Sequence, residues 1–309
     1  MIRFPESGAA LRGVTILLFC LLACTPFSGA HAGDVQRLFI GVTPELSASG
    51  MMRHIADRFE EDRGVKLSWQ VLTPDELFSQ YSSCFVDAII ADIPEREHTF
   101  VGSGFGQGWY ALFHSRLLLV GPRGNPGAVP GSSLLEAMQT IEAARLPFVA
   151  EDTLSGARDA ELFIWSRLQR PANLPVDLHG DLHTKGVAPV NGDWYFLTSP
   201  EEGALPTAAA KRAYTLVTCW EWTVFAERLA QEGKENPLDV VVDSDILVNN
   251  QYNFIILSQE YCPLVHLEAA RTFAEWSMEP ETQSYFAAFR NNGKKIFHAM
   301  DPSIDMNTP

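Results

Sequence analysis

Apolar residues occur along this chain both in short continuous runs and in stripes with helical spacing. Residues 38–42 form a compact apolar run, which predicts a buried strand. Within residues 49–61, apolar side chains recur at Met52, Ile55, Ala56 and Phe59. Positions three and four apart share one face of a helix, so this segment is predicted to be an amphipathic helix.

The same alternation continues to the end of the chain. Strands are expected at 38–42, 65–71, 86–91, 117–120, 147–149, 213–217, 240–242 and 254–257. Helices are expected at 49–61, 74–82, 134–144, 157–168, 204–211, 222–231, 267–278 and 281–290. Such an order predicts an α/β fold of parallel sheets flanked by helices, with ligands at the carboxyl ends of strands. Residues 123–133, rich in Gly and Pro, are expected to cross to a second lobe.

Residues 147–165 combine a strand, a polar turn and a helix. The free N–H groups at the start of that helix could hold a small anion, and Ser155 is expected to cap it. The turn nevertheless carries Glu151 and Asp152, with no cation at its entrance. Acid in this position argues against an anionic ligand.

Composition is ordinary for a globular protein, but the charge is not. Of the 309 residues, 46% are hydrophobic and 20% are charged, and the formal net charge is −15. An acidic surface disfavours nucleic acid or an anionic membrane as a partner. We attribute the charge to a solvated surface rather than to a basic partner.

The first 32 residues have the features of an export signal. Arg3 and Arg12 precede an apolar run at 14–23, and Ala30-His31-Ala32 follows as a cleavage site. Alternatively, Leu21-Leu22-Ala23-Cys24 would direct lipoprotein processing at Cys24, although Leu22 replaces the usual small residue. Both routes lead out of the cytoplasm, and we expect a periplasmic protein.

Three cysteines remain after the expected cleavage: Cys84, Cys219 and Cys262. They allow at most one disulfide, and the sequence leaves the pair open. Their apolar surroundings favour buried, inert thiols.

Several short motifs occur one after another along about 270 residues of the chain. They include Ser49-Gly50, Val120-Gly121-Pro122, Leu146-Pro147-Phe148-Val149, Ser155-Gly156, Ala213-Tyr214-Thr215-Leu216, Pro280-Glu281 and Ala287-Ala288-Phe289-Arg290. In this order the chain resembles the substrate-binding proteins of ABC importers, specifically the tungstate-binding branch. The resemblance implies a two-lobe type II periplasmic-binding-protein fold with two crossover strands and a ligand cleft between the lobes. Its lobes would be 34–121 plus 250–309, and 122–249.

The chain departs from that branch where the branch holds its oxyanion. Glu151 stands where the branch has an arginine before the Ser-Gly turn, and Thr218-Cys219 replaces an Asp-Arg pair. A dry pocket needs a fixed cation for a dianion, because an unpaired buried charge is costly. We therefore expect no tight binding of tungstate or molybdate.

The candidate ligand-binding residues lie in the loops that face the cleft in the resembling fold. They are Thr43, Glu45, Ser47, Ser49, Asp92, Glu151, Thr153, Ser155, Arg158 and Tyr252. Turn and N-cap chemistry is the alternative for the hydroxyls and for Asp92. For Arg158 the favoured alternative is pairing with Glu151 or Glu161.

No catalytic constellation or cofactor motif occurs in the sequence. A metal ion could be coordinated by His179, Asp181 and His183, but a solvated loop is the favoured interpretation of this segment. The sequence thus predicts a monomeric, non-catalytic protein that delivers a small molecule or ion to an ABC permease in the inner membrane. The alternative is an extracytoplasmic sensor or protein-interaction module on the same scaffold.

Overall fold

The computed structural model describes residues 36–152, 155–169, 189, 192–243 and 249–300. None of the helices within these residues is long and apolar enough to cross a membrane. The leader, Thr153 and the metal alternative at His179, Asp181 and His183 lie outside the described residues.

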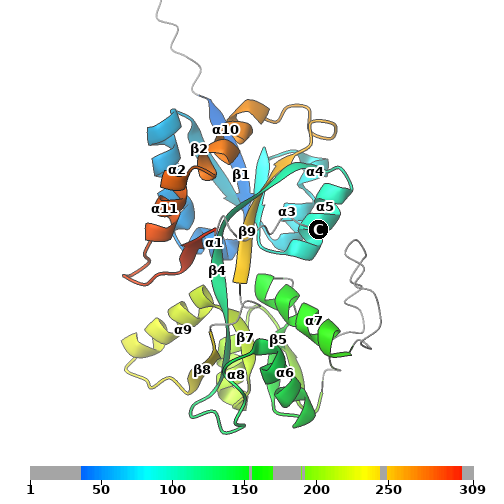
Figure 1. Ribbon diagram of the computed structural model, residues 1–309, viewed down its shortest axis with the longest axis vertical. Coiled ribbons are helices and arrows are strands. Elements are labelled where there is room, and N and C mark those ends of the chain that lie inside the picture. Colours follow the sequence, from blue (N-terminus) through cyan, green and yellow to red (C-terminus); the bar gives the residue numbers. More distant parts are fainter. Residues whose placement is uncertain (1–35, 153–154, 170–188, 190–191, 244–248, 301–309) are drawn as a thin grey trace, which may run out of the picture. The chain divides into compact units, whose positions relative to one another are not determined.

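The described elements belong to two lobes (Figure 1). The first lobe contains β1 (Arg37–Val42), α1 (Pro44–Ala48), α2 (Met51–Arg63), β2 (Lys66–Val71), α3 (Pro74–Phe78), α4 (Gln80–Ser83), β3 (Ala88–Ala91), α5 (Pro94–Gly102), β9 (Asn249–Leu257), α10 (Leu267–Ser277), α11 (Pro280–Ala288) and β10 (Phe297–Ala299). The second contains α6 (Leu134–Ala143), β5 (Phe148–Glu151), α7 (Gly156–Gln169), β6 (Tyr195–Thr198), α8 (Ala204–Lys211), β7 (Thr215–Thr218), α9 (Cys219–Gln231) and β8 (Leu238–Val242). Strand β4 (Gly106–Pro122) runs through both.

One curled sheet connects the lobes, with strand order β10-β4-β9-β3-β1-β2 and with β7 and β8 also paired to β4. The strands β1, β2 and β3 pair in parallel, whereas β4 is antiparallel to all of its partners. The expectation of parallel sheets is therefore only partly met. A separate parallel pair, β5-β6, lies in the second lobe.

Strand β4 itself crosses between the lobes. The glycine and proline content of residues 123–133 suggested that this later segment would be the crossover, and that expectation is wrong. Residues 106–116 of β4 pair with β9, and residues 117–122 pair with β7 and β8. A single extended strand of 17 residues can do this, because each residue advances a strand by about 3.3 Å. Residues 123–133 follow after the crossing.

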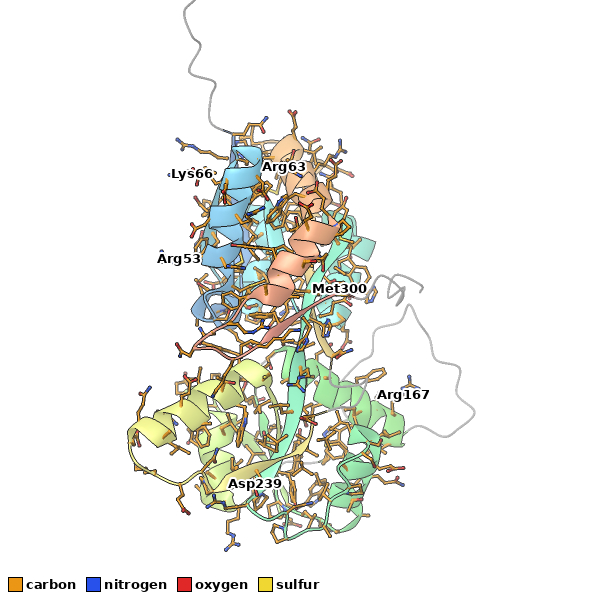
Figure 2. All side chains as sticks on the ribbon, turned by 60° about the vertical axis from the view of Figure 1, so that its left-hand side comes forward. Arg53, Arg63, Lys66, Arg167, Asp239 and Met300 are labelled. Atoms are coloured by element: carbon orange, nitrogen blue, oxygen red, sulfur yellow. A yellow bond between two sulfur atoms is a disulfide. The ribbon has the colours of Figure 1, made fainter. Side chains whose placement is uncertain are left out.

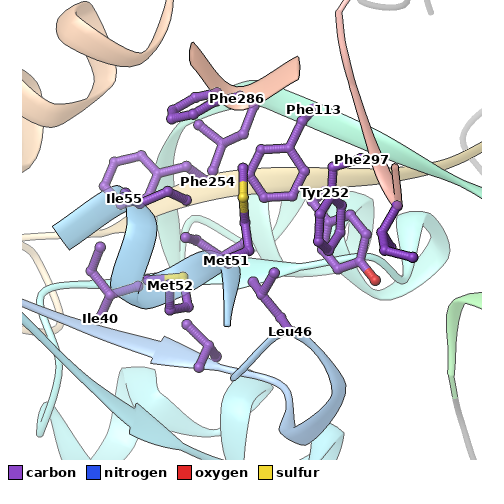
Figure 3. Packing of buried hydrophobic residues seen from close by; sticks show 14 of the residues in the cluster. Ile40, Leu46, Met51, Met52, Ile55, Phe113, Tyr252, Phe254, Phe286 and Phe297 are labelled. Atoms are coloured by element: carbon purple, nitrogen blue, oxygen red, sulfur yellow. The ribbon is translucent and has the colours of Figure 1, made fainter. Parts of the chain in front are cut away.

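The first-lobe core forms where the apolar stripe of α2 meets the sheet and the helices α10 and α11. Met51, Met52 and Ile55 of α2 are fully buried, as are Phe254 and Phe286 opposite them (Figure 3). The helices α2 and α10 lie side by side (Figures 1 and 2). In this way apolar packing fixes the loop after β1, which carries the first candidate ligand residues.

Cys84 and Cys262 form a disulfide with a Cα–Cα distance of 5.4 Å. The expectation of inert buried thiols is wrong for these two, and Cys84 is exposed. The bond closes a chain segment of 178 residues between the end of α4 and the loop after β9. Cys219 is free and buried, as expected.

Candidate functional site

The loop after β1 begins helix α1, which the sequence interpretation missed. Thr43 is its N-cap, and the Thr43 hydroxyl accepts the backbone N–H of Leu46 at 3.5 Å. Glu45 lies in the first turn, where the helix dipole favours a carboxylate. Its buried Oε1 has no hydrogen-bond partner among the described residues.

The two serines of this segment have structural partners. Ser47 accepts the indole N–H of Trp69 at 3.1 Å. The hydroxyl of Ser49, which is fully buried, donates to the Leu46 carbonyl at 2.7 Å and accepts the Met51 N–H at 3.2 Å. The turn-and-cap alternative is thus confirmed for Ser49.

Asp92 follows β3 and lies against strand β9. It is 4% exposed, and its Oδ2 accepts the side-chain N–H of Asn250 at 2.9 Å. Burial raises the pKa of Asp92, while hydrogen bonds from Asn250 and Tyr252 lower it. The ring of Tyr252 packs in the apolar core beside Phe113, with its hydroxyl oxygen at the rim of the cluster (Figure 3).

The amino end of α7 lies directly against these residues. A Cβ placed on Gly156, the first residue of α7, would lie 2.2 Å from Asn250 Oδ1 and 2.7 Å from Asp92 Oδ2. Glycine is therefore required for this close approach. Asp92 and Asn250 therefore contact the second lobe at the turn Ser155-Gly156, which the sequence analysis placed before a helix.

Glu151 ends β5, and its carboxyl faces the backbone N–H of Ala204 at the start of α8. Burial, and next the charge of Glu221, raise the pKa of Glu151 to about 7. A carboxyl at a helix start is normally stabilised in its ionised form. The opposite shift shows that burial and like charge outweigh the helix.

Glu221 is a site residue that the sequence interpretation missed. It sits in the first turn of α9 and forms a capping box with Thr218: its Oε2 accepts the Thr218 N–H at 2.8 Å and the Thr218 hydroxyl at 3.0 Å. Burial, and also the charge of Asp92, raise the pKa of Glu221. The Thr218-x-x-Glu221 spacing, a capping-box signature, was the signal available in the sequence.

We call Glu45, Asp92, Glu151 and Glu221 the interlobe carboxyl cluster. Burial, then the charges of Glu221, Asp92 and Glu151, raise the pKa of Glu45 well above its ordinary value. None of the four carboxyls forms an ion pair with a described residue. In the described part of the chain, no three His, Cys, Asp or Glu side chains are arranged to hold a metal ion.

Ser155 and Arg158 are engaged within α7. The Ser155 hydroxyl accepts the Arg158 N–H at 3.1 Å, as a helix cap does. The Arg158 guanidinium donates to Glu161 at 2.9 Å and is 12% exposed. Pairing with Glu161 was one of the two alternatives for Arg158, and it is confirmed. Glu161 also accepts from Tyr195 and Trp165, so this cation belongs to a buried network.

The structure thus brings Glu45, Asp92, Glu151 and Tyr252 together between the lobes and adds Glu221. Burial and neighbouring carboxyl charges raise the pKa values in the interlobe carboxyl cluster, so its ionised forms repel one another and any anion placed among them. A ligand with positive charge or several N–H or O–H donors would relieve that repulsion. In their ionised forms the four carboxyls therefore favour donors and cations over oxyanions.

No family model matches the chain. Two curated relatives are each named tungstate-binding protein TupA. The one from Peptoclostridium acidaminophilum is 21% identical over 299 residues, covering 94% of each chain. The one from Campylobacter jejuni is 20% identical over 249 residues, covering 81% of this chain and 86% of the relative.

Solved structures show the same fold. The tungstate-binding protein TupA from Desulfovibrio alaskensis matches with a TM-score of 0.71 and 24% identity, over 86% of this chain and 99% of that one. A tungstate ABC transporter structure from Geobacter sulfurreducens matches with a TM-score of 0.63 and 20% identity, over 82% and 98%. The chain has the two-lobe type II periplasmic-binding fold and resembles the tungstate-binding branch.

Proposed function

We propose that this chain is a periplasmic solute-binding protein that holds a small polar ligand between its two lobes and delivers it to an ABC importer in the inner membrane. The extent of the similarity supports this proposal, because the relatives align over nearly their whole length. Their names describe binding and transport, which supports a role without catalysis.

The disulfide between Cys84 and Cys262 supports a location outside the cytoplasm. Disulfides persist in oxidising compartments, and the periplasm is one of them. The expected export signal at 1–32 would bring the chain there, and Cys24 offers the alternative of a lipid anchor. A monomer remains our expectation for the mature protein.

The interlobe carboxyl cluster is the observation from which we infer the charge class of the ligand. Among the described residues none of Glu45, Asp92 and Glu221 is paired with a cation, and an anion placed among their ionised forms would add to their repulsion. A cation or zwitterion would instead pair with the ionised carboxyls. We propose a ligand with at least one positive group, while a neutral ligand rich in donors is the alternative.

A thermal-shift screen of metabolites grouped by charge tests this proposal. A ligand at about 100 times its Kd stabilises the folded state by about 2.7 kcal/mol, which is a measurable rise in Tm. We expect cationic or zwitterionic compounds to give the shift, and Glu221→Gln to reduce it. Glu60→Gln, an exposed change on α2, is the matched control that keeps it.

If no compound in a broad panel stabilises the protein, the solute-binding role is contradicted, and the scaffold would then serve as a sensor or interaction module. If only anions stabilise it, the ligand class proposed here is wrong while the binding role stands.

A further inference from the structure

A second cavity lies between helix α5 of the first lobe and helix α7 of the second, which are neighbours in Figure 1. Its volume is about 340 Å³, within the range of small-molecule sites. It is lined by Phe78, Tyr81, Glu95, Arg96, Thr99, Phe100, Phe105 and Asp159. None of these residues belongs to the interlobe carboxyl cluster.

One side of this cavity is aromatic. The rings of Tyr81 and Phe105 stack with centroids 3.7 Å apart and planes 10° apart, and Phe100 lies at 5.8 Å from Phe105. The faces of such rings attract cations within about 6 Å of the centroid. The protein already uses this attraction here, because the Arg96 guanidinium carbon lies 4.9 Å from the Phe78 ring centroid.

The cavity is also lined by carboxyls from both lobes. Asp159 of α7 faces the backbone N–H of Glu95 at the start of α5, a helix of the other lobe. Burial, and next the charge of Glu95, raise the pKa of Asp159 to about 7. The guanidinium of Arg96, which also lines the cavity, is paired with Asp75 at 2.7 Å.

We propose that this cavity binds an organic cation, with its ammonium group beside Asp159 and its apolar part on Tyr81 and Phe105. A positive group would pair with the Asp159 carboxylate and lie near the faces of aromatic rings. The aromatic surface would hold the apolar part. This site is lined by other residues than the interlobe carboxyl cluster, although the charge of Asp92 also raises the pKa of Asp159. The proposal does not rest on delivery to a permease.

Benzylammonium is a suitable probe, with benzyl alcohol and benzoate as neutral and anionic controls of the same shape. Calorimetric titration of the whole mature protein at about pH 8 should show benzylammonium binding at least about fivefold more tightly than benzyl alcohol, with no binding of benzoate. Asp159→Asn should weaken benzylammonium by about fivefold or more. Asparagine has nearly the same shape as aspartate, so the variant removes the charge with little change in packing.

Two further variants keep the test independent of folding. Phe105→Leu should weaken benzylammonium and benzyl alcohol together, because it removes aromatic surface from the wall. Glu151→Gln, in the interlobe carboxyl cluster, should leave the affinity for benzylammonium within about twofold of the wild-type value. Lowering the pH to about 5.5 should weaken benzylammonium binding, because Asp159 then gains a proton.

The proposal is overturned if benzyl alcohol binds as tightly as benzylammonium, if Asp159→Asn has no effect, or if no probe binds at about ten millimolar. It is equally overturned if Glu151→Gln abolishes binding, since the probe would then occupy the interlobe carboxyl cluster.

Discussion

Glu151 and Glu221 each lie at a helix start with the same carboxyl that enters the interlobe carboxyl cluster. Glu151 faces the Ala204 N–H of α8, and Glu221 accepts the Thr218 N–H of α9. These contacts favour the ionised forms, yet burial raises both pKa values. A cationic ligand beside the ionised carboxyls would offset that cost of burial.

Glu151→Gln should change how stability depends on pH. The pKa of Glu151 is about 7 in the folded protein and near 4.5 in an unfolded chain. The unfolded state therefore releases this proton first, so the stabilisation is full below about pH 4.5 and is lost as the pH rises to 7. Between about pH 5 and pH 8, urea unfolding should show the wild type losing about 2 kcal/mol more than the variant.

Glutamine has nearly the same shape as glutamate, so the variant removes the charge with little change in packing. Glu60→Gln on the exposed face of α2 should follow the wild-type curve. Parallel curves for wild type and Glu151→Gln would show that this carboxyl does not titrate as described.

At the scale of elements, helices with a clear apolar stripe were predictable and the crossover was not. The stripe of α2 and that of α10 match their buried faces. The first half of β4, by contrast, mixes glycines with polar and aromatic residues and has no clear period. The short helices α1 and α5 were missed, although Pro44 and Pro94 at their first positions are start signals.

Gly156→Ala should disturb the contact between α7 and the ends of β3 and β9. The new Cβ would lie 2.2 Å from Asn250 Oδ1, and that amide is held by its own bond to Asp92. Overpacking of this kind costs about 1–3 kcal/mol, so either the fold is destabilised or the lobes move apart. We expect a lower Tm, weaker binding of the interlobe ligand and a larger radius of gyration by X-ray scattering.

Gly102→Ala is the matched control, because a Cβ there meets nothing within 4 Å. A Gly156→Ala protein with unchanged Tm, affinity and radius of gyration would contradict the close contact.

At the scale of the molecule, the two-lobe fold followed from a resemblance spread over most of the chain. The resemblance did not predict which residues make up the site, because its four carboxyls come from four separate parts of the chain. Glu45 and Asp92 stand after β1 and β3, whereas Glu151 and Glu221 stand in the second lobe. Sequence reasoning could place each one at the end of a strand or the start of a helix, but only the folded chain shows that their charges interact.

Calorimetric titration of the mature protein with tungstate at about pH 7.5 tests the central claim most directly. The claim is that this scaffold, whose relatives are named for tungstate binding, has an acidic site that rejects oxyanions. We predict no tungstate binding with a submicromolar Kd, because none of the carboxyls in the interlobe carboxyl cluster is paired with a cation among the described residues. A one-to-one titration with a submicromolar Kd for tungstate would contradict the claim.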